Sequence, residues 1–174
     1  MKRNFLTLLC TVLMLGAVCN LNAQKFYSQS VGGMVGNMWG GSYQLYLTDN
    51  IVLGADLGVK LVYTAGQEVN GIDLMTLELN PNVMYSVNFT PELNGLFGGG
   101  ISLGYNFLAW NFNRVDMGKF GINALAGIEY KLDAPLVLQA DIRPGFGMLF
   151  GAGGGKPWPY FDWAACVTLR YILD

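Results

Sequence analysis

The chain has 174 residues, a formal net charge of −2 and no histidine. Nucleic-acid-binding proteins usually carry a basic surplus, which this chain lacks, and without histidine it has neither the usual general base nor the commonest metal ligand. Charged residues make up 13% of the sequence and hydrophobic residues 52%, whereas soluble domains contain roughly 25% charged residues. We therefore expect no enzyme, no cofactor, no metal site and no nucleic-acid partner.

The first residues have the pattern of a secretory signal peptide. A positive start, an apolar core and a small-residue exit follow one another: Lys2 and Arg3, Phe5–Val18, and Leu21–Ala23. The pattern predicts a signal over residues 1–23, which leaves residues 24–174 as one domain. Cys166 would then be the single cysteine of the exported chain.

The clearest element is the alternation over residues 51–63. Every second residue is apolar: Ile51, Leu53, Ala55, Leu57, Val59, Leu61 and Tyr63. The residues between them carry the glycines and both charges of the stretch. A period of two predicts one extended strand with an apolar face, and its length suits a tilted strand that crosses a bilayer.

The same alternation recurs along the chain and predicts eight strands. They cover residues 27–36, 42–48, 51–63, 73–89, 95–108, 119–132, 136–148 and 161–173. Membrane barrels spread their apolar residues over alternate positions in this way. The pattern indicates an all-β fold, an eight-stranded antiparallel transmembrane up-and-down β-barrel.

The connections between these segments alternate between short turns and longer loops. We expect long loops at 64–72, 109–118 and 149–159, and a short connection at 37–41. Short periplasmic turns and longer outside loops are the usual asymmetry of outer-membrane barrels. Pro81 and Pro144 lie in mid-strand and cannot donate to a ladder, so we predict a local bulge at each.

Alternation alone leaves open which face meets the lipid. A soluble barrel of the lipocalin kind would place the apolar row inside. An eight-stranded lumen, however, is just wide enough for side chains to fill it, and the apolar row contains most of the Leu, Ile, Phe, Tyr and Trp of all eight strands. The other row is largely Gly, Ser, Thr and Asn. Volume therefore favours an apolar face toward lipid.

Charged residues fall on the inward row. Its acids and bases are Asp56, Glu78, Glu129, Asp141 and Asp162 against Lys60, Lys119, Lys131, Arg143 and Arg170. Arg or Lys facing the middle of a bilayer would cost about 2–4 kcal/mol, and buried charges must be paired. We predict a charge network in the lumen, formed by Asp56, Lys60, Glu78, Glu129, Asp141, Arg143 and Arg170.

Two diagonal pairs are expected within this network. Folding the chain about loop 64–72 brings Lys60 near Glu78, and folding about loop 149–159 brings Asp141 near Arg170. A fully paired network would close the lumen. The same residues could instead line a narrow passive path for ions or small solutes, and the sequence leaves both readings open.

The signal, the eight amphipathic segments and the aromatic-containing last strand resemble the small outer-membrane barrels of Gram-negative bacteria, the OmpX and OmpA barrel type. The last strand ends at Tyr171-Ile172-Leu173-Asp174, whereas members of that family usually end in an aromatic residue. The resemblance implies export to the bacterial outer membrane, contact with its lipids and a structural or surface-interaction role. We expect a monomer whose loops 64–72, 109–118 and 149–159 face possible extracellular partners.

Overall fold

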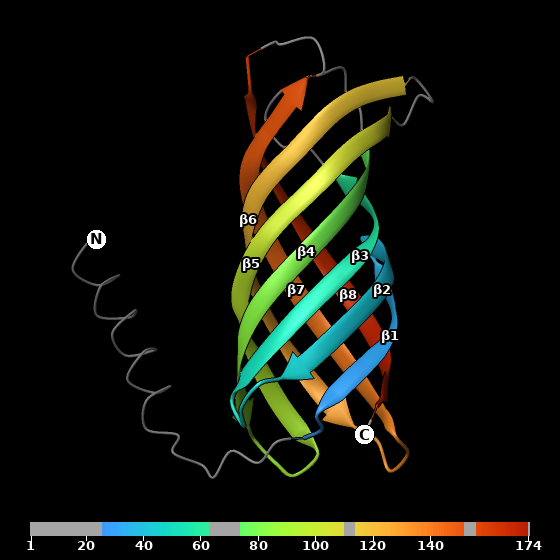
Figure 1. Cartoon of the computed structure of the whole chain (residues 1–174), viewed down its shortest axis with the longest axis vertical. Helices are drawn as coiled ribbons and strands as arrows, with labels where there is room; N and C mark the ends of the chain where they lie inside the picture. The colour runs from blue at the N-terminus through green and yellow to red at the C-terminus, as the bar shows by residue number, and fades with distance from the viewer. Residues whose placement is uncertain (1–25, 63–73, 110–113, 152–155, 174) are drawn as a thin grey trace, which may run out of the picture.

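The computed structural model describes residues 26–62, 74–109, 114–151 and 156–173, and these form eight strands. The strands are β1 (Gln29–Gly36), β2 (Met38–Tyr46), β3 (Ile51–Val62), β4 (Leu74–Asn88), β5 (Leu93–Ala109), β6 (Arg114–Lys131), β7 (Leu136–Gly151) and β8 (Trp158–Ile172). Each pairs antiparallel with the next, and β1 pairs with β8 to close the barrel (Figure 1). The predicted closed barrel of eight antiparallel strands is confirmed. The predicted signal peptide 1–23 lies outside the described residues.

A membrane-spanning helix is not among the elements found: no helix in the described ranges is long and apolar enough to cross a bilayer.

The strands run further toward the loops than the sequence predicted. The expected connection 37–41 is wrong, because β2 begins at Met38 and Asn37 alone joins it to β1. The expected loops 109–118 and 149–159 are also too long, since β6 begins at Arg114 and β7 continues to Gly151. These strand ends contain glycine and polar residues, so their strand propensity is weak. Pairing with a neighbouring strand overrides that weak propensity. Loop 64–72 lies outside the described residues.

The predicted bulges at Pro81 and Pro144 are wrong. Register is unchanged across both residues, and the only shifts among the described pairs lie near Met75 and Asn106. Each residue of an antiparallel strand directs its N–H toward one neighbour only. Pro81 pairs regularly with β3, and the ladder toward β5 skips it. Pro144 likewise pairs with β8, while the ladder toward β6 skips it. At each proline, therefore, one of the two ladders lacks a pair and the strand forms no bulge.

The two faces of the wall are as different as the alternation predicted. Along β7 the odd residues from Val137 to Leu149 are buried, and the even residues from Leu138 to Phe150 are exposed. Large apolar side chains cover the outside, and polar and charged side chains fill the lumen. The soluble carrier with an apolar interior is therefore excluded by the direction in which the side chains point.

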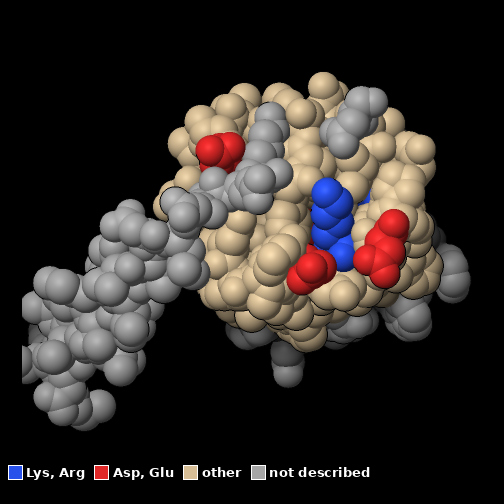
Figure 2. Space-filling model, turned by 90° about the horizontal axis from the view of Figure 1, so that it is seen from below, with Lys and Arg blue, Asp and Glu red and all other residues tan. Residues whose placement is uncertain are grey.

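One end of the barrel carries the short turns, near residues 47–50, 89–92 and 132–135, and both termini of the described chain (Figure 1). We call this end the base and the opposite end the loop end. Seen from below, the base is mostly covered by uncharged atoms, with charged side chains at a few places (Figure 2). Just inside the base, the end of the lumen is filled by an apolar cluster: Phe26, Tyr27, Tyr46, Val52, Met84, Leu96, Leu125, Val137 and Ile172.

Candidate functional site

The candidate site is the lumen itself, where all seven residues of the predicted network are buried. Lys119 and Asp162 also point inward, so the described part of the chain places five buried carboxylates beside four buried cations. Lys131 does not join them. It lies half-buried at the base and donates to the carbonyl oxygen of Phe26 at 3.0 Å. The charges form three groups at successive heights, which we call the basal, middle and upper layers.

The basal layer is built around Glu129 and Arg170. The guanidinium of Arg170 lies 3.1 Å from the Glu129 carboxylate and also donates to Gln139. Tyr46 donates to the second carboxylate oxygen at 2.8 Å, and Tyr27 donates to the first. Burial, and then the charge of Glu129, raise the pKa of Tyr27 well above its usual value, so its hydroxyl stays protonated and serves as a donor.

The middle layer is a single arginine between two aspartates. Arg143 donates from Nε to Asp141 at 2.5 Å, and from Nη1 to Asp56 on β3. Gln139 donates to Asp141 at 2.6 Å, and Asn82 to Asp56 at 3.4 Å. This layer links β3, β4 and β7 across the lumen, so it occupies the centre of the barrel.

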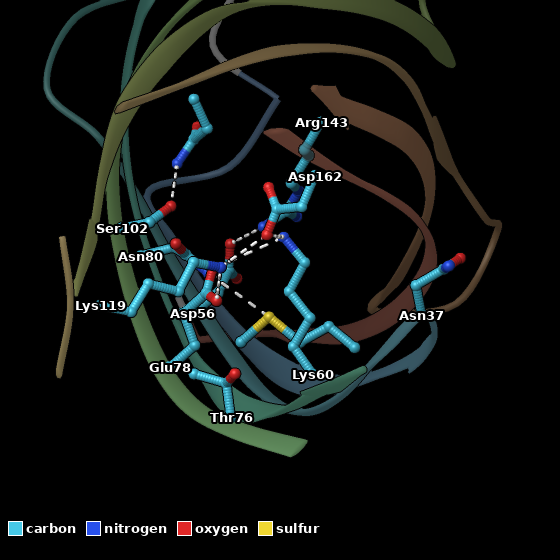
Figure 3. Close-up of polar contacts among 12 residues, drawn as sticks. Asn37, Asp56, Lys60, Thr76, Glu78, Asn80, Ser102, Lys119, Arg143 and Asp162 are labelled. Atoms are coloured by element: carbon cyan, nitrogen blue, oxygen red, sulfur yellow. Dashed lines mark hydrogen bonds and ion pairs between the residues drawn. The ribbon is translucent and has the colours of Figure 1, made fainter. Parts of the chain in front are cut away.

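The upper layer holds two lysines and two carboxylates. Lys119 lies 2.5 Å from Glu78 and 2.6 Å from Asp162, while Lys60 lies 2.9 Å from Asp162 and 3.7 Å from Glu78. Figure 3 shows both ammonium groups directed toward these carboxylates from different parts of the wall. The Tyr160 ring stacks against Lys119, with Nζ 4.8 Å from its centroid.

A glycine makes room for this layer. A Cβ placed on Gly121 would lie 2.2 Å from the Tyr160 hydroxyl and 2.7 Å from the carbonyl oxygen of Phe146. Only the missing side chain lets the Tyr160 ring turn into the lumen beside Lys119.

The two expected diagonal pairs have different outcomes. Lys60 and Glu78 do meet in the upper layer. The expected approach of Asp141 to Arg170 is wrong, because Asp141 lies opposite Cys166 in the β7–β8 register while Arg170 lies opposite Val137. Arg170 is therefore four residues along β8 from the residue opposite Asp141, which is too far for a diagonal contact. Arg170 pairs with Glu129 instead, and Asp141 with Arg143.

Several lumen residues were not anticipated. Tyr46 follows Ser42 and Gln44 on the inward row, so parity alone could have identified it. Tyr27 was expected in the first strand, but β1 begins two residues later, at Gln29, and Tyr27 is buried beneath the basal layer. No sequence signal indicates this turn of the chain. Among the described residues no group of acidic and cysteine side chains is arranged to hold a metal ion.

Comparison with known proteins supports the architecture. The fold is similar to the crystal structure of the N-terminal β-barrel domain of Pseudomonas aeruginosa OprF, with a TM-score of 0.58 and 15% sequence identity. The similarity covers 83% of this chain and 96% of that domain. Neither a protein-family model nor a curated protein sequence matches this chain. At such low identity the likeness establishes the fold and leaves the activity to be argued from the lumen.

Proposed function

We propose that this chain is an integral barrel of the bacterial outer membrane whose lumen has no open axial path. The observation that carries the proposal is the contrast between the two faces. Leu57, Ile122, Ile142 and Phe146, which lie on three different strands, are each at least 54% exposed on the outside. Exposed apolar area of this extent belongs in lipid rather than in water.

The proposed closure is supported by the filling of the lumen. Three charged layers cross it above the apolar cluster at the base, and Phe26 and Tyr27 of the N-terminal segment are part of that cluster. An eight-stranded barrel has room for side chains and little else. The role is then structural, or it belongs to contacts that the loop end makes outside the cell, including the predicted loops 64–72, 109–118 and 149–159. The barrel acts as a monomer, without enzyme chemistry.

A narrow passive channel is the second candidate. Asn80 and Asn82 line the lumen between the middle and upper layers, and each keeps a buried side-chain oxygen that accepts no hydrogen bond from the described residues. Polar groups of this kind suit a hydrated path for small ions. The even mixture of lysines, arginines and carboxylates would give such a path little preference for the sign of the ion.

Single-channel recording separates the two candidates. The refolded protein is incorporated into a planar bilayer beside an Arg143→Ala, Arg170→Ala double variant. A closed lumen predicts no stable openings for the native protein. Stable openings whose conductance changes in the double variant would overturn closure and establish the channel. Flotation with lipid vesicles is measured in parallel, and a protein that stays in the aqueous fraction would overturn the membrane proposal itself.

A further inference from the structure

An interior row of the barrel alternates between polar residues and glycines. Five residues, paired one after another from β4 to β8, form this row: Asn82, Gly100, Asn123, Gly145 and Asp162. We call them the polar row. The lumen of an eight-stranded barrel is normally filled by inward side chains, and two of the five positions have none to contribute. The three polar side chains therefore lie beside positions that hold only backbone.

Two of these side chains lean over the glycines. A Cβ placed on Gly100 would lie 2.6 Å from Oδ1 of Asn82, and one placed on Gly145 would lie 2.6 Å from Oδ1 of Asp162. Both oxygens are thus directed along the row toward Asn123, which stands between the two glycines. Asn123 faces the lumen, where it donates to Ser102 at 3.1 Å, and yet it is only part-buried. A species as small as water or a bare ion can reach the row.

Three amide oxygens in this part of the lumen accept no hydrogen bond from the described residues. They are the Oδ1 atoms of Asn80, Asn82 and Asn123. Asn80 and Asn82 are each 3% exposed. The amide nitrogen of Asn82 donates to the carbonyl oxygen of Asn80 at 2.9 Å and to Asp56 at 3.4 Å, which fixes its oxygen on the opposite side. Buried acceptors without a donor are costly and call for water or an ion.

The charges of the lumen distinguish an ion from water. Among the described residues, the basal and upper layers each contain as many cations as carboxylates, whereas Arg143 alone faces Asp56 and Asp141 in the middle layer. One negative charge is left over, and a buried charge needs a counter-charge. Asn82 connects the polar row to this layer through its contact with Asp56. Water would satisfy the amide oxygens only, while a cation would satisfy them and the surplus charge.

The atoms along the row indicate the kind of cation. Lys60 and Lys119 both contact Oδ2 of Asp162, and its Oδ1 lies over Gly145 on the other side of the carboxylate. Oδ1 of Asn82 and Oδ1 of Asn123 complete a set made of oxygen alone. Oxygen ligands suit hard cations, and a surplus of one negative charge matches a single positive charge.

We propose that the polar row binds one alkali-metal cation through the side-chain oxygens of Asn82, Asn123 and Asp162, and that this ion balances the surplus charge of the middle layer. The inference goes beyond the closed barrel, because it adds a resident ion to the lumen. It does not depend on the membrane location, so flotation and single-channel recording leave it to be decided by its own experiment.

Urea unfolding in two salts tests the site. The protein is refolded in phosphatidylcholine vesicles and unfolded in sodium chloride or in N-methylglucamine chloride at the same concentration, since the organic cation is too large for the lumen. The native protein is compared with Asn123→Ala and with Asn94→Ala. Asn94 is a matched control, because it is also a buried asparagine with an unpartnered Oδ1 but lies beside Tyr46 in the basal layer.

A bound sodium ion predicts a higher urea midpoint for the native protein in sodium chloride. The shift should be about 1 M when sodium is present at about a hundred times its dissociation constant. Asn94→Ala should keep the shift and Asn123→Ala should lose it. Equal native midpoints in the two salts would mean that water satisfies the oxygens and would overturn the proposal. An undiminished shift in Asn123→Ala would place the ion elsewhere and would also overturn it.

Sodium-23 NMR of the native protein tests the site without any variant. In detergent micelles, exchange of sodium with a rigid site in the folded lumen should broaden the resonance relative to empty micelles. Unfolding the protein in urea should remove the added width. A line width equal to that of empty micelles would overturn the proposal, and so would a broadening that persists after unfolding.

Discussion

Individual lumen residues act as groups that each tie several strands together. Arg170 is fully buried on β8, and its guanidinium donates to Glu129 on β6, Gln139 on β7 and Ser42 on β2. A buried charge is tolerated only when it is paired and hydrogen-bonded. The Arg170–Glu129 pair therefore stabilises the base only while both charges are present.

Replacing one partner should cost more than replacing both. We expect Arg170→Met to lower the free energy of unfolding by about 3–5 kcal/mol, because it leaves Glu129 buried without its cation. Adding Glu129→Gln to that variant should restore part of the loss. Urea unfolding of the refolded protein in vesicles measures both. A single variant as stable as the native protein would show that Tyr27 and Tyr46 alone satisfy the carboxylate.

Gly36 is the one described glycine with a positive φ, 144°, and it immediately precedes Asn37. A Cβ at this position would lie 2.1 Å from the carbonyl oxygen of Ala165. We expect Gly36→Ala to destabilise the barrel by about 1–3 kcal/mol through backbone strain. Gly33→Ala is the matched control, since its Cβ would meet nothing closer than 3.8 Å. Equal unfolding midpoints for the two variants would contradict this expectation.

At the scale of the strand, proline placement follows the direction of each N–H. Pro81 faces a skipped section of the β4–β5 ladder and Pro144 a skipped section of the β6–β7 ladder. Pro159 faces the side of β8 that no described strand pairs with. The first two lie opposite a neighbouring strand and the third does not, which makes them distinguishable by experiment.

Alanine at these positions restores an N–H, and its effect should depend on what lies opposite. We expect Pro81→Ala to gain a ladder hydrogen bond to β5, worth about 0.5–1.5 kcal/mol, and a slowly exchanging amide at residue 81. Pro159→Ala should gain neither, because its new N–H points to the side of β8 that no described strand pairs with. Unfolding midpoints and amide exchange of both variants provide the measurement. A protected amide at residue 159 would mean that a partner covers this side of β8.

At the scale of the whole molecule, the apolar face of the barrel wall lies outside, which is the reverse of a soluble barrel. Leu57 lies in the middle of β3 and is 54% exposed on the outer face. If that face meets hydrocarbon, an arginine there should cost about 2–4 kcal/mol. In water, the same substitution on an exposed site would have little effect.

We therefore expect Leu57→Arg to unfold at a clearly lower urea concentration than the native protein in lipid vesicles. Asp49→Arg, in the exposed turn after β2, should remain at the native midpoint. Both variants are refolded into the same vesicles and followed by tryptophan fluorescence. Insertion of Leu57→Arg with unchanged stability would contradict the membrane location of the outer face.

The amino-acid sequence alone is enough to predict the number of strands and which residues share a face, because a period of two is local and is repeated along the chain. Side-chain volume and charge then predict which face turns inward. The sequence also placed Asp56, Lys60, Glu78, Glu129, Asp141, Arg143 and Arg170 inside, because parity decides the side of a strand without any knowledge of its neighbours.

Which charges meet depends on the three-dimensional arrangement of the strands. The partner of Arg170 depends on the β7–β8 register and on the curvature that brings β6 within reach, and neither is encoded in alternation. The same applies to the Lys60–Asp162 contact, since β3 and β8 are not neighbours in the ring and their side chains meet across the lumen. Local spacing sets the face of a side chain, whereas closure of the ring sets its partner.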